Sequence, residues 1–428
     1  MLTRIDLRGV PGDLRALLAT GESGADLSAA VGEIISAVRT GGDAALRTLT
    51  ARFDGVDIED VLVSPGAIAE AVDQISPGLR AGLELARDQI LAWHEAQREK
   101  EARHERLGVE VHERVVPVDR AGCYVPGGLA QYPSSVLMTA IPARVAGVPE
   151  VILCTPPGPG GAVSPSVLVA ASIAGVDAVY RVGGVQAIAA MAYGTESIRP
   201  VDVVVGPGNA YVAEAKRQVY GVVGIEGLAG PSEVAIVADD TVDPAWVAAD
   251  LLAQAEHGPG GAVTVIVWDD AVADRVDLAL ETLLMTTARR AEAQATLEAG
   301  GRVVIVADPP TAVEVANAIA PEHLELMCED AELLTPLVRS AGAVFVGAYA
   351  PAVLGDYVAG TNHVLPTGGT ARFSSALRVA NFQKHIHVVR ASAAAVQRVG
   401  PAARVVAEAE GLHAHADALR MREESGSE

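Results

Sequence analysis

The stretch VDVVVGPGNAYVAEAKRQVYG (Val201–Gly221) contains a short apolar strand, a glycine-rich turn and a helix. A continuous apolar run of this length is typical of a strand in a parallel sheet that is buried on both faces. Similar runs recur between predicted helices, with the sequences EVILCTPP, DAVYRVGG, SEVAIVAD, AVTVIVW, RVVIVAD and AVFVG. Strands that alternate with helices predict doubly wound α/β units.

These segments predict two Rossmann-like, doubly wound α/β domains with an N-terminal helical arm and a C-terminal helical tail. The arm is expected at residues 1–22 and the tail domain at residues 378–428. The first α/β domain is expected to combine residues 23–123 with residues 232–377, and the second to cover residues 124–231. A chain of 428 residues is long enough for two or three such units.

The charge of the chain argues against several classes of partner. Its 32 Lys and Arg residues face 54 Asp and Glu residues, which gives a formal net charge of −22. Nucleic acids and anionic membranes need clustered Lys and Arg, so neither is an expected partner. Long uncharged stretches near residues 121–143 and 151–176 are interrupted by Pro and Gly, and neither is expected to span a membrane. Three Cys without a CxxC pair favour the reducing cytoplasm.

Three glycine-rich turns lie in the middle of the chain. In GPGNAY, Tyr211 occupies the third glycine position of GxGxxG, so the dinucleotide fingerprint is incomplete. This turn is either a plain connection or a phosphate-binding turn at a helix start. YVPGG and RVGGVQA each place one polar side chain, Tyr124 or Gln186, beside flexible backbone. Several such turns at strand ends indicate a ligand crevice.

Polar pairs mark two segments in the second half of the chain. In LLAQAEHGPG, Gln254 and His257 lie one helical turn apart at the end of a helix. In PEHLEL, Glu322 and His323 are adjacent and are expected to point apart. A His that titrates near neutrality beside a Glu that can activate water would suit acid/base chemistry. A surface Glu beside a structural His remains the alternative.

Two later segments add further polar groups. GDYVAGTNHVLPT holds Asp356 and His363, and EGLHAHADAL holds Glu410 and His415. Two imidazoles, a carboxylate and an amide oxygen suit Zn²⁺ or a similar ion. The residues that could supply these four donors are Gln254, His257, Asp356 and His415. The residues alone do not single out this set among the ten His of the chain.

The motifs strongly resemble the histidinol dehydrogenase family. The matching segments, in order, are AGCYVPGGLAQYPSSVLMTAIPARVAGV, RVGGVQAIAAMAYGT, VGPGNAYVAEAKR, AGPSEVAIVAD, LLAQAEHGP, APEHLEL, GDYVAGTNHVLPT and AEAEGLHAHADAL. They extend over nearly the whole chain after the N-terminal arm. The resemblance implies a zinc-dependent cytoplasmic homodimer that oxidises L-histidinol to L-histidine with two NAD⁺, the last step of histidine biosynthesis.

The resemblance also implies a role for particular residues. The implied ligands of one Zn²⁺ per subunit are Gln254, His257, Asp356 and His415. The implied substrate contacts are Ser232, Gln254, His257, His323, Asp356, Glu410 and His415. The implied NAD contacts are Tyr124, Gln186 and Asn209. The first α/β domain would then carry the metal and catalytic residues, and the second would supply the NAD-binding side. The tail with Glu410 and His415 is expected to complete the active site of the partner subunit.

The implied chemistry gives the acid/base work to two residues. His323 would take the hydroxyl proton as hydride leaves for NAD⁺, and Glu322 would activate water to hydrate a bound histidinaldehyde. His323 would then assist the second hydride transfer. Of the three Cys, Cys123 beside Tyr124 is the only plausible thiol nucleophile, and it is not the expected route.

Two alternatives remain at this point. A relative with the same scaffold could oxidise a different alcohol, such as a sulfonated diol. Ser232 and Glu410 argue against that substrate because they suit a cationic amine or an imidazole donor. A non-catalytic zinc-binding protein is the other alternative, and the Glu322–His323 pair argues against it.

Overall fold

The computed structural model describes residues 2–10, 12–18, 27–127, 131–228, 230–258 and 260–425. The chain forms two compact units. The first unit combines Met1–Gln97 with Asp119–Phe382, and the second combines Arg98–Val118 with Gln383–Glu428. Among the described residues, none of the helices has the length and apolar character that crossing a membrane requires.

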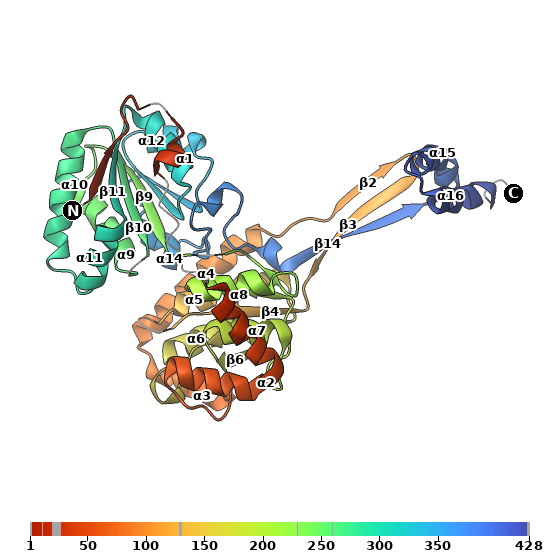
Figure 1. Ribbon diagram of the computed structural model, residues 1–428, viewed down its shortest axis with the longest axis horizontal. Helices are drawn as coiled ribbons and strands as arrows, with labels where there is room; N and C mark the ends of the chain where they lie inside the picture. The colour runs from red at the N-terminus through yellow and green to blue at the C-terminus, as the bar shows by residue number, and fades with distance from the viewer. Residues whose placement is uncertain are drawn as a thin grey trace. The chain divides into compact units, whose positions relative to one another are not determined.

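The first unit contains a six-stranded parallel sheet in the order β1-β11-β10-β9-β12-β13 (Figure 1). Its strands are β1 (Thr3–Asp6), β9 (Glu233–Ala238), β10 (Ala262–Val267), β11 (Gly301–Ile305), β12 (His323–Met327) and β13 (Ala343–Val346). Helices cover both faces. One face packs on α9 (Pro244–Ala255), α10 (Asp270–Leu284) and α11 (Arg290–Gly300), and the other on α1 (Leu14–Leu18), α12 (Pro309–Ile319) and α13 (Ala331–Leu334). Burial on both faces explains why the strands are almost continuously apolar.

A five-stranded parallel sheet in the order β6-β5-β4-β7-β8 forms the rest of the first unit's framework. Its strands are β4 (Arg120–Tyr124), β5 (Glu150–Thr155), β6 (Ala178–Arg181), β7 (Val203–Val205) and β8 (Gly224–Ile225). The helices around it are α2 (Ser28–Asp54), α3 (Pro65–Ala71), α4 (Pro77–Ala96), α5 (Pro133–Ala146), α6 (Pro165–Ala174), α7 (Gly184–Tyr193) and α8 (Ala210–Val219). Side chains of α2, α7 and α8 share one buried core with this sheet. The predicted doubly wound α/β class is therefore confirmed.

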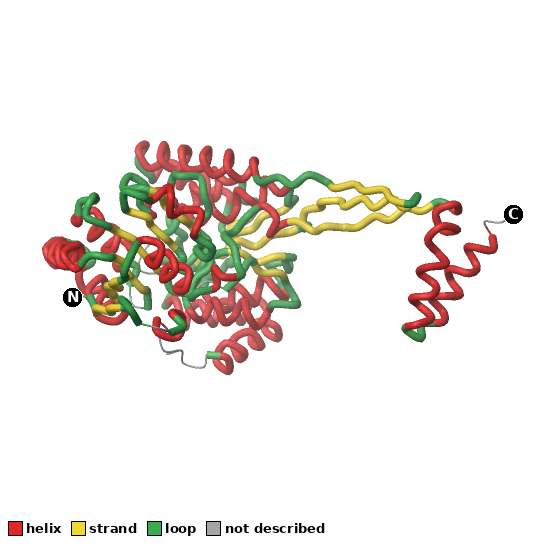
Figure 2. Tube along the Cα trace, turned by 90° about the horizontal axis from the view of Figure 1, so that it is seen from above, coloured by secondary structure: helices red, strands yellow, loops and turns green. Residues whose placement is uncertain are grey.

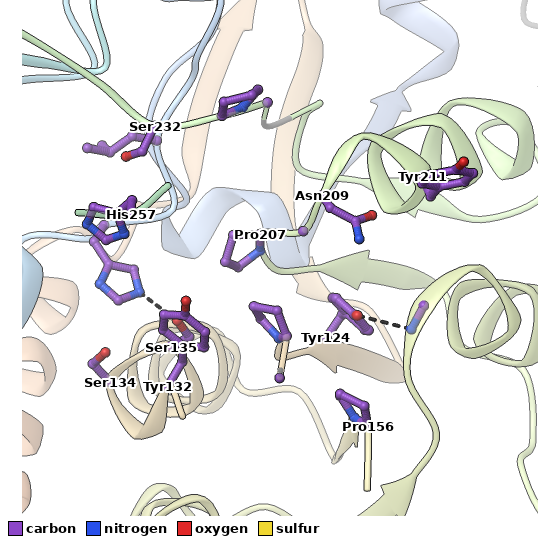
Figure 3. Close-up of a pocket in the computed structure, with 18 of the residues that line it drawn as sticks. Tyr124, Tyr132, Ser134, Ser135, Pro156, Pro207, Asn209, Tyr211, Ser232 and His257 are labelled. Carbon is purple, nitrogen blue, oxygen red and sulfur yellow. Dashed lines mark hydrogen bonds between the residues drawn. The ribbon is translucent and has the colours of Figure 1, made fainter. Parts of the chain in front are cut away.

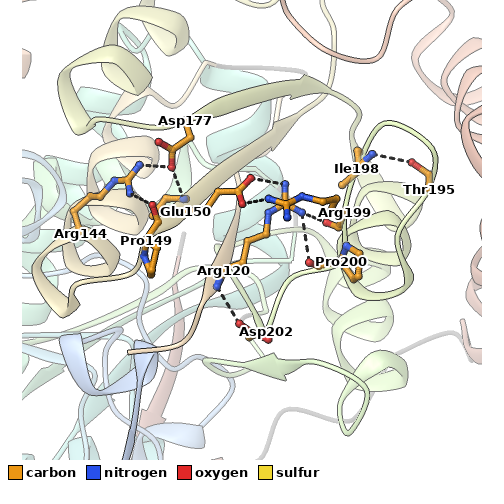
Figure 4. Close-up of polar contacts among 11 residues, drawn as sticks. Arg120, Arg144, Pro149, Glu150, Asp177, Thr195, Ile198, Arg199, Pro200 and Asp202 are labelled. Carbon is orange, nitrogen blue, oxygen red and sulfur yellow. Dashed lines mark hydrogen bonds and ion pairs between the residues drawn. The ribbon is translucent and has the colours of Figure 1, made fainter. Parts of the chain in front are cut away.

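A polar network fixes the amino ends of the five-stranded sheet (Figure 4). Oδ2 of Asp202 accepts a hydrogen bond from the backbone N–H of Arg120 over 2.9 Å. The guanidinium of Arg120 pairs with Glu150 over 3.0 Å, and Arg199 pairs with the same carboxylate. These contacts hold β4, β5 and the start of β7 in register at the amino ends of the strands, opposite the glycine-rich turns.

The second unit is built on an antiparallel sheet in the order β14-β3-β2. Its strands are β2 (Ala102–Arg106), β3 (Val109–Pro117) and β14 (Gln383–Ala391), and two helices follow, α15 (Ala393–Ala409) and α16 (His413–Ser425). Figure 2 shows the three strands side by side, followed by the two helices. The two helices pack against each other.

The structure divides the chain differently from the sequence prediction. Residues 3–6 of the predicted arm form β1 at the edge of the six-stranded sheet, and residues 19–22 lie outside the described residues. Most of residues 23–123 pack with the five-stranded sheet rather than with residues 232–377, because the apolar face of α2 belongs to that core. The predicted tail also needs β2 and β3 from residues 98–118 to complete its sheet.

Candidate active site

The first unit contains a cavity of about 780 Å³ between the carboxyl ends of one sheet and the amino ends of the other (Figure 3). Tyr124, at the end of β4, lines one side of it together with the turns that follow β5, β6 and β7. Ser232, immediately before β9, lines the other side. The site residues predicted from the sequence that line this cavity are Tyr124, Gln186, Asn209, Ser232, His257, Glu322, His323 and Asp356.

The Tyr124 side of the cavity is held by backbone hydrogen bonds. The Tyr124 hydroxyl accepts the N–H of Gly184, at the start of α7, over 3.0 Å. Gln186 is buried in the first turn of α7, and Oδ1 of Asn209 accepts the N–H of Val212 over 3.1 Å as the N-cap of α8. Two helix N-termini therefore lie at this wall, and free N–H groups at such ends favour an anion.

The GPGNAY turn departs from a dinucleotide fingerprint as its sequence predicts. Tyr211, at the third glycine position, has a half-exposed side chain in the first turn of α8. Gly206 has φ +126°, and a Cβ there would lie 2.0 Å from the carbonyl oxygen of Tyr124. The first glycine is therefore needed for a close approach between two backbones.

Glu322 and His323 occupy the opposite side and are both buried. Oε2 of Glu322 accepts hydrogen bonds from the Ser232 hydroxyl and from the N–H of Glu233. His323 Nδ1 contacts the carbonyl oxygen of Glu233 at 3.2 Å, and Nε2 lies 3.5 Å from Oδ1 of Asp356. The prediction that the two side chains point apart is wrong. Glu322 precedes β12, so its carboxylate reaches back to within 3.6 Å of His323 Nδ1.

The surroundings shift the pKa values of this pair. Burial raises the pKa of Glu322, and the neighbouring His323 and the donors Ser232 and Glu233 only partly offset it. Burial alone would lower the pKa of His323. The hydrogen bond with Asp356 and the charges of Glu322 and Asp356 outweigh burial and raise that pKa to about 9. A proton is therefore strongly held within this cluster of two carboxylates and one imidazole.

Three of the four predicted metal ligands lie along a second, adjoining cavity of about 550 Å³. Gln254 is buried in the last turn of α9, and its Nε2 has no hydrogen-bond partner among the described residues. His257 follows the helix, and Asp356 lies in the short helix α14 (Ala352–Tyr357). His257 and Asp356 line both cavities. Partial burial lowers the pKa of the His257 imidazole, despite the opposing charge of Asp356.

The remaining predicted ligand and substrate contacts belong to the second unit. Glu410 is the C-cap residue of α15, and His415 lies in the first turn of α16. Both side chains are exposed. Within the described part of the chain, His, Cys, Asp and Glu side chains form no group of three or more that could hold a metal ion.

Three further residues line the cavity, and the sequence analysis assigned no role to any of them. Ser135 in α5 contacts His363 Nε2 over 3.0 Å, and His363 Nδ1 contacts the carbonyl oxygen of Asp356 over 2.9 Å. Asp54 at the end of α2 lines the same cavity, and burial raises its pKa to about 6. His363 and Ser135 lie in segments that resemble the family, but no local signal marks Asp54.

Comparison with known proteins gives the family context of this site. The family model described as histidinol dehydrogenase matches residues 19–423. A histidinol dehydrogenase from Rhizobium meliloti (strain 1021) is 48% identical over 420 residues, which cover 97% of this chain and 96% of the relative. Another from Cereibacter sphaeroides is 49% identical over 418 residues, with the same coverage.

A solved structure agrees over the complete chain. The crystal structure of histidinol dehydrogenase from Elizabethkingia anophelis has a TM-score of 0.95 and 35% sequence identity. The match covers 100% of this chain and 99% of that chain.

Proposed function

We infer from its membership of the histidinol dehydrogenase family, which the comparisons establish, that this dehydrogenase oxidises L-histidinol to L-histidine through a bound histidinaldehyde. Two NAD⁺ would be reduced in the last step of histidine biosynthesis, in the cytoplasm. The observation that carries the proposal is the meeting of Glu322 and His323 with Tyr124 and Asn209 in one cavity. An acid/base pair thus faces a wall that suits a dinucleotide.

The NAD⁺ site is proposed at the wall formed by Tyr124, Gln186 and Asn209. The N-termini of α7 and α8 lie there, and their N–H groups suit the pyrophosphate of a dinucleotide. NAD⁺ bound there would supply the two-electron acceptor. The chain's own contribution is to hold the cofactor near His323 and the reacting carbon.

The zinc site is proposed at Gln254, His257 and Asp356. The donor set fits Zn²⁺, because an amide oxygen, a neutral imidazole and a carboxylate are its ordinary ligands. The lowered pKa of His257 favours the neutral form that a ligand requires. Because Nε2 of Gln254 has no hydrogen-bond partner among the described residues, a half-turn of the amide can present its oxygen to the ion without loss of a hydrogen bond from Nε2. Bound zinc would position the imidazole and amine of histidinol.

His323 is the proposed base for the hydroxyl proton. Its Nδ1 contacts a carbonyl oxygen, which can only accept, so Nδ1 carries a proton. Nε2 faces the cavity and lies 3.5 Å from Oδ1 of Asp356. The hydrogen bond with Asp356 is the largest contribution that raises the pKa of His323. Engagement of Asp356 by another group would therefore bring this pKa back toward neutrality.

Glu322 is the proposed base for the second half of the reaction. Its carboxylate is oriented by Ser232 and by the N–H of Glu233. Burial raises its pKa, which strengthens it as an acceptor of a proton from water. Water activated there would hydrate the bound aldehyde, and His323 would accept the second hydroxyl proton.

A second copy of the chain is proposed to complete the site. Gln254, His257 and Asp356 open on the second cavity, which has room for side chains from outside the first unit. The Glu410 and His415 side chains are exposed on the second unit, where Val405, Leu412 and Met421 are also 62%, 44% and 70% exposed. Exposed apolar side chains on these two helices and in the turn between them favour an interface. We propose that Glu410 and His415 of the partner subunit enter the second cavity.

Two experiments test these proposals. Addition of histidinol and NAD⁺ to the zinc-loaded protein should produce NADH, and no NADH with histidinol would contradict the proposed substrate. Mixed refolding of the inactive variants His257→Ala and His415→Ala should restore about a quarter of the wild-type activity, because half of the sites in half of the dimers would be intact. No restoration would contradict a site shared between subunits.

A further inference from the structure

A buried ion pair holds the turn between β7 and α8. Lys216 lies in α8 and Glu226 follows β8, and their side chains are 2% and 6% exposed. Lys216 Nζ donates to Oε1 of Glu226 over 2.8 Å and to the carbonyl oxygen of Gly206 over 3.2 Å. The same Oε1 accepts the N–H of Gly206 over 2.7 Å. The pair therefore satisfies both backbone polar groups of one glycine.

Gly206 connects the ion pair to the proposed NAD⁺ wall. Its α-carbon packs so closely on Tyr124 that a Cβ would lie 2.0 Å from the Tyr124 carbonyl oxygen. Three residues later Asn209 caps α8, the helix that carries Lys216. A shift of Gly206 would therefore move both Tyr124 and the Asn209 turn, which face the cavity.

Stability alone does not account for this ion pair. Burial of two charges costs solvation, and apolar residues of similar volume are often at least as stabilising. Oε2 of Glu226 is buried without a hydrogen-bond partner among the described residues, which adds to the cost. Neither Lys216 nor Glu226 is among the residues that line the main cavity. Their contacts go instead to the backbone of the turn that does.

We propose that Lys216 and Glu226 are positioning residues for the dinucleotide and do not touch it. They clamp Gly206 so that Tyr124, Asn209 and the N-terminus of α8 form one preorganised wall. This inference rests on the proposed function, because it requires a dinucleotide in the main cavity. Lys216 and Glu226 would then affect the binding of the cofactor and not the chemical steps.

The test compares variants of this pair with a matched ion pair on the same sheet. Lys216→Met removes the clamp, and the double variant Lys216→Met with Glu226→Leu removes it without leaving a buried charge. Arg120→Met is the control, because the buried Arg120 forms an ion pair with the partly buried Glu150 at the amino ends of the strands, opposite the glycine-rich turns (Figure 4). The affinity of each zinc-loaded variant for NAD⁺ and for histidinol is measured by calorimetry, beside its melting temperature.

Both clamp variants should bind NAD⁺ about tenfold more weakly, which corresponds to about 1.4 kcal/mol. Their affinity for histidinol and their kcat at saturating NAD⁺ should stay within about twofold of wild type. Arg120→Met should lower the melting temperature without a specific loss of NAD⁺ affinity. Glu226→Gln keeps an oxygen that accepts the N–H of Gly206, and should retain more NAD⁺ affinity than Lys216→Met.

Several outcomes would overturn the proposal. A folded double variant that binds NAD⁺ as tightly as wild type would contradict it. Equal losses of NAD⁺ and histidinol affinity would indicate a general structural role. A failure of Lys216→Met to fold leaves the double variant to decide. Wild-type protein that binds no NAD⁺ would instead refute the proposed function.

Discussion

The backbone N–H of Glu233 donates a hydrogen bond to Oε2 of Glu322 over 3.0 Å, and Ser232 donates to the same oxygen. Ser232, just before β9, and Glu233, the first residue of β9, thus orient the carboxylate of Glu322, which precedes β12. The parallel pairing of these neighbouring strands, with His323 opposite Val234, brings the two segments together. The proposed acid/base pair is therefore positioned by the pairing of two strands and not by its local sequence.

Glu322→Gln should separate the two half-reactions. The amide keeps the shape and can still accept the hydrogen bonds of Ser232 and Glu233, but it cannot take a proton from water. Oxidation of histidinaldehyde should fall at least about 100-fold, within the range of general-base effects, and oxidation of histidinol much less. Single-turnover assays with each substrate measure the two rates. Equal losses on both would contradict the role of Glu322 as the base for hydration.

Cys123 should be dispensable for catalysis. Its side chain is fully buried, and burial raises the pKa of its thiol to about 12, so almost no thiolate exists near neutrality. Cys123→Ala should keep turnover with both substrates near the wild-type value. Native protein should also leave this thiol unreacted with iodoacetamide. A large loss of aldehyde oxidation in the variant would revive a thiohemiacetal route.

Glu233 should make the stability of the protein depend on pH. Burial raises its pKa from 4.5 to about 7, and the hydrogen bond from the N–H of Gly368 only partly offsets this. The folded protein then binds more protons than the unfolded chain between these values. The contribution is complete below pH 4.5 and is lost as the pH rises to about 7, and amounts to about 3 kcal/mol.

Glu233→Gln should flatten this part of the stability curve. The amide oxygen can still accept the N–H of Gly368, so the variant should gain stability relative to wild type as the pH passes from 4.5 to 7. Urea unfolding of both proteins across this range measures the difference. An unchanged pH dependence would show that Glu233 is not the titrating group.

Asp356→Asn should weaken zinc binding through the loss of a charged ligand. Loss of about 100-fold in affinity is expected, measured by competition with a chromophoric chelator. Asp243→Asn is the matched control, because Asp243 begins α9 as its N-cap and Asn caps a helix equally well. Equal zinc affinity of Asp356→Asn and wild type would place the metal elsewhere.

Much of the framework is visible in the sequence, because buried parallel strands are nearly continuous apolar runs. Two edge strands, β1 and β14, are harder to predict from the sequence. Residues 3–6 form a strand only because β11 offers a partner, and their own pattern is mostly polar. The strand β14 is largely exposed, so it lacks the apolar signal of the core strands.

The sequence indicates several residues of the candidate site but not how they are arranged. Motifs indicate Glu322 and His323, but only the turn before β12 explains why both face one cavity. Lys216 is a stronger case. In the polar segment AEAKRQ it looks like an exposed helix residue, and its side chain is in fact buried against Glu226. Contacts of this kind depend on segments that only the fold brings together.

The yield of NADH per histidinol consumed tests the central claim most directly. Purified, zinc-loaded protein is given limiting L-histidinol and excess NAD⁺, and NADH is counted at completion together with the product. The account predicts two NADH for each histidinol, with histidine as the only product. One NADH and released aldehyde would contradict the four-electron oxidation.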